Sequence, residues 1–147
     1  MVEILEPADG ETLAIQYLQA LFVSEADFEG VEFVGSLPAE VEGYEPPAEA
    51  VVVRLTGLSA RDETVDVHQL TLTAWAASPT DELRASAIAR RAGAFMRLAE
   101  RLGAMAGVPC SRVQTFSFYN DPDPITGRAR YSATYAVSLR GQVVRAS

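Results

Sequence analysis

The chain has no lysine, one cysteine and one histidine among its 147 residues, and these scarcities restrict its chemistry. A single cysteine, Cys110, cannot form an intrachain disulfide and has no partner ligands for a zinc site. We expect the single histidine, His68, to be a surface or half-buried strand residue, because no serine or cysteine nucleophile motif accompanies it. We therefore expect no catalytic residue, no metal site and no cofactor, and we expect the protein not to be an enzyme.

Long hydrophobic runs are also absent. No stretch reaches the roughly 18 consecutive apolar residues of a membrane span, so we expect no membrane partner. The first residues, Met1 to Pro7, lack the basic and apolar segments of a signal peptide. With 48% hydrophobic and 22% charged residues, the composition is that of one globular domain over residues 1–147.

Charge is divided unevenly along the chain. Residues 1–53 contain twelve acidic residues and no basic one, whereas residues 54–147 contain all twelve arginines and eight acidic residues. The two parts therefore carry net charges of −12 and +4, which give the overall −8. Opposite charges at two ends can orient copies head to tail, although a solvated acidic segment explains the pattern equally well. An acidic chain also disfavours direct binding to duplex DNA.

The first half of the chain predicts one short helix, a short extended segment over residues 31–37 and a pair of strands. Asp9 or Thr12 is suited to cap the helix, because apolar residues at helical spacing follow. Residues 50–57 and 65–77 have strand patterns joined by a short polar link, which favours antiparallel pairing. Between the helix and these strands, residues 38–49 are rich in Pro and Glu, and we interpret them as a surface loop for interaction.

A long helix is predicted next. The sequence Ser78-Pro-Thr-Asp81 is close to a capping box, and the helix is expected to end near Met105. Another face carries Arg90, Arg97 and Arg101, either as a solvated face or as a contact surface for an acidic neighbour. The apolar residues expected to face the sheet recur about every seven positions or lie beside those that do: Ile88, Phe95, Leu98, Leu102 and Met105.

The chain then predicts a β-hairpin. Residues 113–119 and 129–140 alternate as strands, and the turn between them is rich in Asp, Pro and Gly. We interpret Asp121 and Asp123 as turn residues; the alternative, a carboxylate pair for metal or acid–base chemistry, has weak support. The predicted fold is therefore α+β: a mainly antiparallel sheet of four to five strands, with one short N-terminal helix and one long helix packed on one face, and a C-terminal β-hairpin.

The order of these motifs resembles one family, the tail terminator (tail completion) proteins of long-tailed, non-contractile phages of high-GC, actinobacterial hosts. The resemblance covers residues 46–141: a Pro-Pro pair, Val-Val-Val-Arg54, Leu-Thr-Leu-Thr-Ala-Trp75-Ala, an Ala- and Arg-rich helix, an Asp-Pro turn, and a strand that starts at Arg-Tyr131 and closes in Arg-Gly141. One position departs from the family pattern, because Ala129 stands where many relatives have Pro.

The resemblance implies a binding role without catalysis. Such proteins form a ring, expected here to be a hexamer, on the head-proximal end of the tail tube. The ring stops polymerisation of the tail tube protein and joins the tail to head-completion (connector) proteins, while DNA only passes through its lumen. The protein would be made in the host cytoplasm and located in the virion. Alternatives are a head-closure or connector protein of the same virion, or a small α+β ligand-binding domain or enzyme.

The candidate contact residues come from the resemblance, the proline-rich loop, the helix arginines and the turn. None is assigned a catalytic, cofactor-binding or metal-binding role. They are Glu42, Tyr44, Glu45, Arg54, Trp75, Arg90, Arg97, Arg101, Asp121, Asp123, Arg128, Arg130 and Tyr131.

Overall fold

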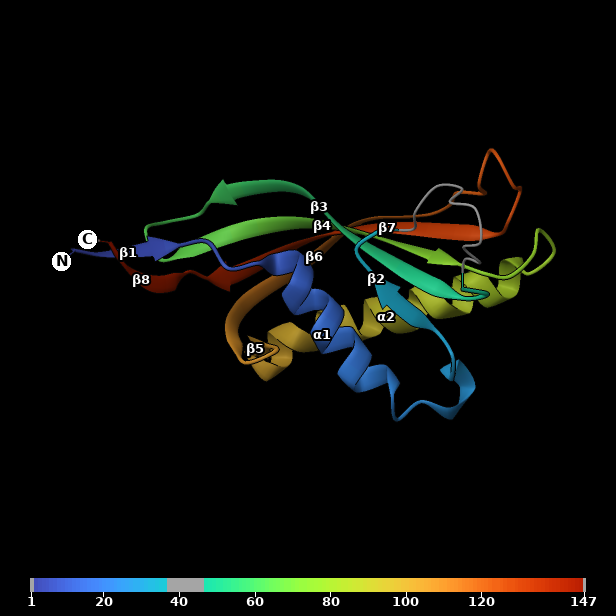
Figure 1. Ribbon diagram of the computed structural model, residues 1–147, viewed down its shortest axis with the longest axis horizontal. Coiled ribbons are helices and arrows are strands. Elements are labelled where there is room, and N and C mark those ends of the chain that lie inside the picture. The colour runs from blue at the N-terminus through green and yellow to red at the C-terminus, as the bar shows by residue number, and fades with distance from the viewer. Residues whose placement is uncertain (1, 37–46, 147) are drawn as a thin grey trace.

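The computed structural model describes residues 2–36 and 47–146 (Figure 1). The elements follow one another as β1 (Val2–Glu6), α1 (Gly10–Phe22), the 3₁₀ turn η1 (Ala26–Phe28), β2 (Glu32–Val34), β3 (Ala50–Ala60), β4 (Val65–Trp75), α2 (Glu82–Leu102), β5 (Ala104–Met105), β6 (Val108–Asn120), β7 (Arg130–Arg140) and β8 (Gln142–Ala146).

The main sheet has six strands in the order β2-β3-β4-β7-β6-β5. All neighbours are antiparallel except β2 and β3, which are parallel. Both helices lie on one face of this sheet (Figure 1). The predicted α+β class and the C-terminal hairpin are confirmed, but the count of four to five strands was too low. The edge strand β5 accounts for the difference, because a strand of two residues carries no periodicity.

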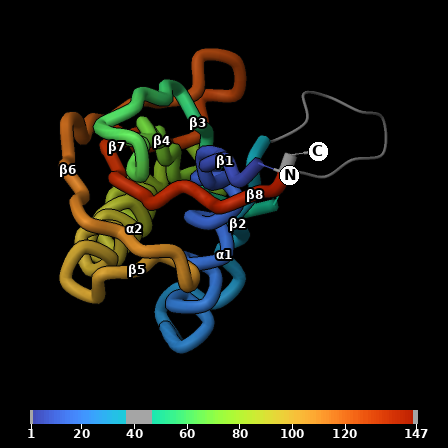
Figure 2. Tube along the Cα trace, turned by 90° about the vertical axis from the view of Figure 1, so that its left-hand side faces the viewer, coloured from blue at the N-terminus to red at the C-terminus, as the bar shows by residue number. Residues whose placement is uncertain are grey.

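A second sheet was not expected from the sequence. Strands β1 and β8 pair antiparallel, with Ile4 opposite Val144 and Leu5 opposite Val143. They form a two-stranded ribbon that extends beyond one end of the main sheet (Figure 1). In the view of Figure 2 the strands β1 and β8 again lie side by side. We call Val2–Glu6 together with Gln142–Ala146 the terminal ribbon.

Alternating side chains of the central strands build the core against the helices. In β4 the side chains of Leu70, Leu72 and Ala74 lie on one face and are almost inaccessible. The same face continues on the flanking strands through Val51 and Val53 of β3 and through four residues of β7: Ala133, Tyr135, Val137 and Leu139.

Helix α2 is shorter than predicted at both ends. Its N-cap is Asp81 rather than Ser78, and Ser78 instead begins a turn in which its carbonyl accepts the Asp81 N–H at 3.3 Å. Its C-cap, Gly103, has φ 72°, the left-handed conformation that favours glycine. Met105 lies beyond the helix, fully buried in β5.

The face that α2 turns toward the sheet was predicted only in part, since Ile88 of the predicted stripe is fully buried there. Its buried positions are mostly small, whereas Leu102 of the predicted stripe is 60% exposed. Small residues allow the helix to approach closely: a Cβ added at Gly93 would come within 2.5 Å of the Tyr135 hydroxyl oxygen. The closeness of the helix to the sheet therefore determines which stripe is buried, and it favours small side chains over large apolar ones. The buried stripe consists of Ala85, Ile88, Ala89, Ala92, Gly93, Met96 and Ala99.

Helix α1 begins as the sequence predicts. Asp9 is the N-cap, and its carboxylate accepts the Thr12 N–H at 3.1 Å and the Thr12 hydroxyl at 2.8 Å. These hydrogen bonds lower the pKa of Asp9. At the other side of the helix layer, the Tyr17 hydroxyl donates to the Phe95 carbonyl at 2.6 Å and links α1 to α2.

Candidate interaction surfaces

The β6–β7 turn has the geometry that its sequence predicts. The Asp123 carboxylate accepts the Thr126 hydroxyl at 2.5 Å and the Thr126 N–H at 3.0 Å, and Gly127 has φ 71°. Bonds to Thr126, the hydroxyl above all, lower the pKa of Asp123. Asp123 is only 9% exposed, so its carboxylate is a structural part of the turn.

Arg130 closes this turn from the strand side. Its Nε donates to the Asp121 carbonyl at 2.7 Å, and its guanidinium lies 3.2 Å from the Asp121 carboxylate and 3.9 Å from that of Asp123. The Ser132 hydroxyl completes the set by donating to Asp121 at 2.9 Å. The two aspartates therefore have arginine and hydroxyl partners. Among residues 2–36 and 47–146, no group of three or more His, Cys, Asp or Glu side chains is arranged to hold a metal ion.

Arg128 joins three separate segments. Its Nε donates to the Ala76 carbonyl at 2.9 Å, and one terminal nitrogen donates to the carbonyls of Pro47 and Ala48 at 3.1 and 3.0 Å. Arg128 and Arg130 both stack on Trp75, with their guanidinium carbons 5.0 and 4.9 Å from the ring centroid. These candidate contact residues are thus brought together, but their polar groups are occupied within the fold.

The helix arginines separate into two groups. Arg90, Arg97 and Arg101 are exposed, as predicted, and make no salt bridge within the described residues. Two other arginines, which the sequence reading did not single out, pair with N-terminal acids: Arg84 bonds Glu49 at 2.5 and 3.0 Å, and Arg91 bonds Glu25 at 2.5 Å. Part of the charge division therefore acts within the chain.

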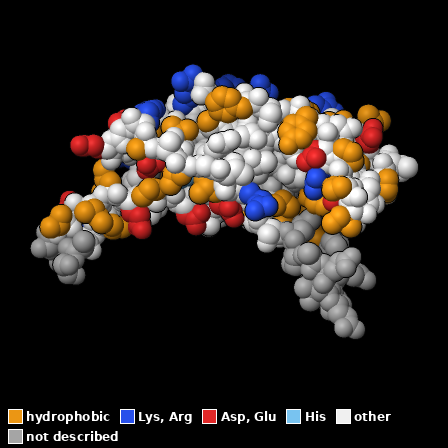
Figure 3. All heavy atoms as spheres, turned by 90° about the horizontal axis from the view of Figure 1, so that it is seen from above, with side chains coloured by type: hydrophobic (Ala, Val, Ile, Leu, Met, Phe, Trp, Pro, Cys, Tyr) orange, Lys and Arg blue, Asp and Glu red, His pale blue; other side chains and the backbone are white. Residues whose placement is uncertain are grey.

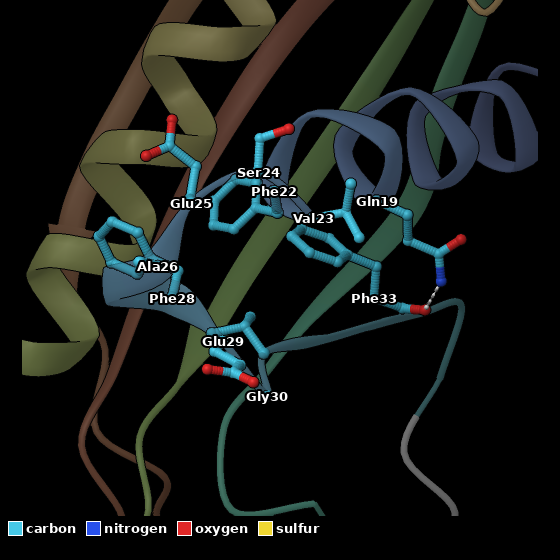
Figure 4. A pocket seen from close by; sticks show the side chains of 11 residues that line it. Gln19, Phe22, Val23, Ser24, Glu25, Ala26, Phe28, Glu29, Gly30 and Phe33 are labelled. Carbon is cyan, nitrogen blue, oxygen red and sulfur yellow. Dashed lines mark hydrogen bonds between the residues drawn. The ribbon is translucent and has the colours of Figure 1, made fainter.

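A hollow of about 600 Å³ lies beside these pairs, where α1 ends and η1 and β2 begin (Figure 4). Its wall is an edge-to-face cluster of aromatic rings. The centroid of the Phe22 ring lies 5.5 Å from that of Phe28 and 4.7 Å from that of Phe33. The guanidinium carbons of Arg84 and Arg91 lie over the Phe28 ring, 4.9 and 5.0 Å from its centroid. The arrangement packs the end of the helix layer onto the sheet edge, and its carboxylate Glu25 is held by Arg91.

The face of the sheet opposite the helices carries four arginines and one strand carboxylate, Glu32 of the edge strand β2, which is in register with Ala50 and Trp75. Strands β3, β4, β6 and β7 contain one carboxylate, Asp66, which pairs with Leu139 on the helix-covered face. Their four arginines fall on the other face, in register with the odd-numbered residues of β4: Arg54, Arg112, Arg130 and Arg140. We call this surface the uncovered face.

Uncharged polar groups fill the middle of the uncovered face. Hydroxyl pairs join Thr56 to Thr71 at 3.2 Å, Thr71 to Thr134 at 3.3 Å, and Thr73 to Ser132 at 3.1 Å. Figure 3 shows the molecule from this side: basic side chains gather mainly along one long edge and acidic ones mainly along the other. On this side of the molecule the two signs of charge therefore lie mostly apart.

His68 corrects an expectation. Its position in the sequence suggested a surface or half-buried residue, but it is fully buried on the helix-covered face, and neither ring nitrogen has a hydrogen-bond partner in the described structure. Burial lowers its pKa, against smaller opposing effects of Asp66 and Asp9. His68 lies two residues before Leu70, so the strand alternation that places Leu70 and Leu72 on the buried face also places His68 there.

The remaining candidates are placed as follows. Arg54 is exposed on the uncovered face, and Tyr131 is half-buried, with its ring 5.7 Å from that of Phe118. Glu42, Tyr44 and Glu45 lie outside the described residues, as does most of the loop predicted over 38–49.

No protein-family model matches the chain, and no curated protein sequence matches it. Within the part of the chain that the structure describes, no helix is both long and apolar enough to cross a membrane.

Proposed function

We propose that the protein is a structural component of a phage virion, a tail terminator that closes the head-proximal end of the tail tube as a ring. Its partners would be further copies of itself, expected to form a hexamer, together with the tail tube protein and the head-completion proteins. The proposal starts from the resemblance over residues 46–141 and involves no catalysed reaction.

One structural observation supports this proposal most directly: opposite charges lie on different surfaces of the same subunit. Arg54 and Arg112 are exposed on the uncovered face and make no salt bridge within the described residues, and Glu3 and Glu6 are exposed on the terminal ribbon. A ring needs two different, complementary surfaces on each copy, because a heterologous contact repeats until the ring closes. Complementary charge orients such encounters and speeds association.

The test combines the mass of the protein in solution with binding to tail tubes. We expect native mass measurement and negative-stain images to show a ring, and the ring to bind tube ends and stop their elongation. Rising salt should slow assembly more than it weakens finished rings, because exposed charge pairs contribute under about 1 kcal/mol each. A protein that stayed monomeric even with tail tubes would contradict the proposal.

The same experiment separates the nearest alternative. A head-closure or connector protein would form a ring but bind purified heads in preference to tail tubes.

Arg54→Glu with Arg112→Glu should reduce assembly without unfolding the subunit, since both side chains are exposed. Arg90→Glu with Arg97→Glu, on the helix side, is the matched control. Equal loss in both double variants would mean that the uncovered face has no special role.

A further inference from the structure

The terminal ribbon is poorly covered by the rest of the molecule. Every residue of β1 is exposed, with Val2 at 63%, Ile4 at 47% and Leu5 at 39%. Within the described residues, β1 and β8 contact each other and make few contacts with any other helix or strand. An isolated two-stranded ribbon is at best marginally stable in water, so a surface that packs against it would stabilise it.

The two faces of the terminal ribbon differ in charge. The pairing places Val2, Ile4 and Val144 on one side, and Glu6 shares that side at the end nearest the main sheet. The opposite side carries the exposed apolar pair Leu5 and Val143 together with Glu3 and Arg145, an exposed ion pair at 3.7 Å. Packing against an apolar surface is therefore expected for the Ile4 side, which has no ion pair and has the Glu6 carboxylate at one end.

The uncovered face offers a matching surface. A hollow of about 520 Å³ lies on the uncovered face, where Gly57–Ser59 of β3 pair with Val67–Gln69 of β4, and we call it the sheet hollow. Phe116 and Leu58 on its wall are 65% and 48% exposed. It is lined by Gly57, Leu58, Ser59, Val67, Gln69, Phe116 and Ala136.

Charge around the sheet hollow complements the terminal ribbon. Arg54 and Arg112 lie on the strands that carry the hollow's walls, are exposed, and make no salt bridge within the described residues. On the ribbon, Glu3 is paired with Arg145 on the opposite side, so Glu6 is the carboxylate that the Ile4 side presents. An apolar strip that ends in a carboxylate thus matches a partly apolar hollow with arginines on its wall strands.

The free edges of β3 and β6 indicate how the contact is made. Both strands have register shifts beside the hollow, between Leu55 and Gly57 in β3 and between Thr115 and Ser117 in β6. Bulges at an edge oppose the addition of another strand through backbone hydrogen bonds. Side-chain packing into the hollow is therefore favoured over extension of the sheet.

We propose that the terminal ribbon of one copy docks by its Ile4 side into the sheet hollow of a second copy. The contact joins two different surfaces, so it repeats from copy to copy. The inference deepens the proposed function, and rests on it for the closure of these contacts into a ring.

Cysteine cross-linking tests the contact directly, because the native Cys110 is buried. Two single variants, Ile4→Cys and Phe116→Cys, are mixed and treated with a short bifunctional thiol reagent. We expect a covalent dimer that contains one subunit of each kind. The matched control replaces Phe116→Cys by Leu83→Cys, since Leu83 on α2 is 87% exposed. Several-fold more heterodimer with Phe116→Cys supports the proposal, and equal yields overturn it.

A second measurement uses Ile4→Asp, with Ile125→Asp in the β6–β7 turn as its control. Loss of oligomer with Ile4→Asp alone, at unchanged circular dichroism of the folded subunit, is the expected result. A normal oligomer with Ile4→Asp and no specific cross-link would overturn the ribbon contact while leaving the ring intact. A wild-type monomer would remove the proposed function as well. Loss of the cross-link on addition of a single-stranded oligonucleotide that binds the hollow would make nucleic acid the occupant and overturn the proposal.

Discussion

The guanidinium carbon of Arg128 lies 5.0 Å from the centroid of the Trp75 ring. The same guanidinium donates to the main-chain carbonyl of Ala76, which follows Trp75, and to those of Pro47 and Ala48. One side chain thereby ties the end of β4 to residues 47–48 and to the β6–β7 turn. Its role in the isolated subunit is stability.

Replacing Arg128 should consequently destabilise the subunit. We expect Arg128→Ala to lower the free energy of unfolding by about 1 to 3 kcal/mol, because it leaves part-buried carbonyls without donors and removes a cation–π contact. Arg128→Lys should recover only part of this loss, since an ammonium lacks the planar fork. Urea unfolding checks both, with the exposed Arg90→Ala as control. A loss no larger than that of Arg90→Ala would assign Arg128 to an interface instead.

Gly93 and Tyr135 form a second coupled pair. Gly93→Ala should lower the free energy of unfolding by about 1 to 2 kcal/mol, because overpacking against the Tyr135 hydroxyl outweighs the gain of up to about 1 kcal/mol in helix propensity. Tyr135→Phe removes the oxygen that a Cβ would meet at 2.5 Å. The double variant should therefore be more stable than the sum of the single changes implies. Strict additivity in denaturant unfolding would contradict this account.

Buried His68 predicts a pH dependence of stability near neutrality. Its pKa is lowered in the folded protein, so at pH values just below the unfolded pKa of about 6.5 the unfolded chain binds a proton that the folded chain does not. Stability should therefore fall from pH 7 to pH 5, by up to about 1.4 kcal/mol for each pH unit below the unfolded pKa.

His68→Leu is the matched variant for this prediction. It should remove most of the slope between pH 7 and pH 5, while leaving the losses at more acidic pH that come from Asp9 and Asp123, whose pKa values are lowered. Thermal unfolding across this pH series measures both chains. An unchanged slope in His68→Leu would show that other groups set the pH dependence.

Cys110 should be chemically inert in the folded protein. Burial raises its pKa to about 11, and the residue is 2% exposed, so little thiolate is present or reachable at pH 8. We expect a chromogenic thiol reagent to react only as fast as the protein unfolds. Leu83→Cys provides an exposed thiol as a control that should react at once. Prompt labelling of Cys110 in the native protein would contradict the burial.

Most of the fold follows from local sequence signals. The Asp9 cap, the alternation along β4 and β7, and the turn built on Asp123 and Gly127 each have one physical cause that lies within a few residues. The α+β class and the hairpin follow from these. The side-chain contacts at the turn could be predicted once the pairing of β4 with β7 brings Arg128 and Arg130 within reach of Trp75.

Other features depend on residues distant in sequence and could not be read this way. The terminal ribbon pairs the first strand with the last. The buried stripe of α2 depends on how closely Gly93 approaches Tyr135, a distance set by the sheet and not by hydrophobicity. For the same reason the ion pairs of Arg84 and Arg91 with Glu49 and Glu25 were missed, since each joins residues at least 35 positions apart.

The pairing of β1 with β8 makes the described chain almost a closed loop. Val2 lies opposite Ala146, and Gly141 lets β7 run on into the ribbon, because a Cβ there would stand 3.0 Å from the Glu6 carbonyl oxygen. Fraying of β1 would therefore also remove the pairing partner of β8, and fraying of β8 that of β1. A short linker between Val2 and Ala146 would turn the ribbon into a hairpin, so that a circular permutant could open elsewhere and still keep both strands in place.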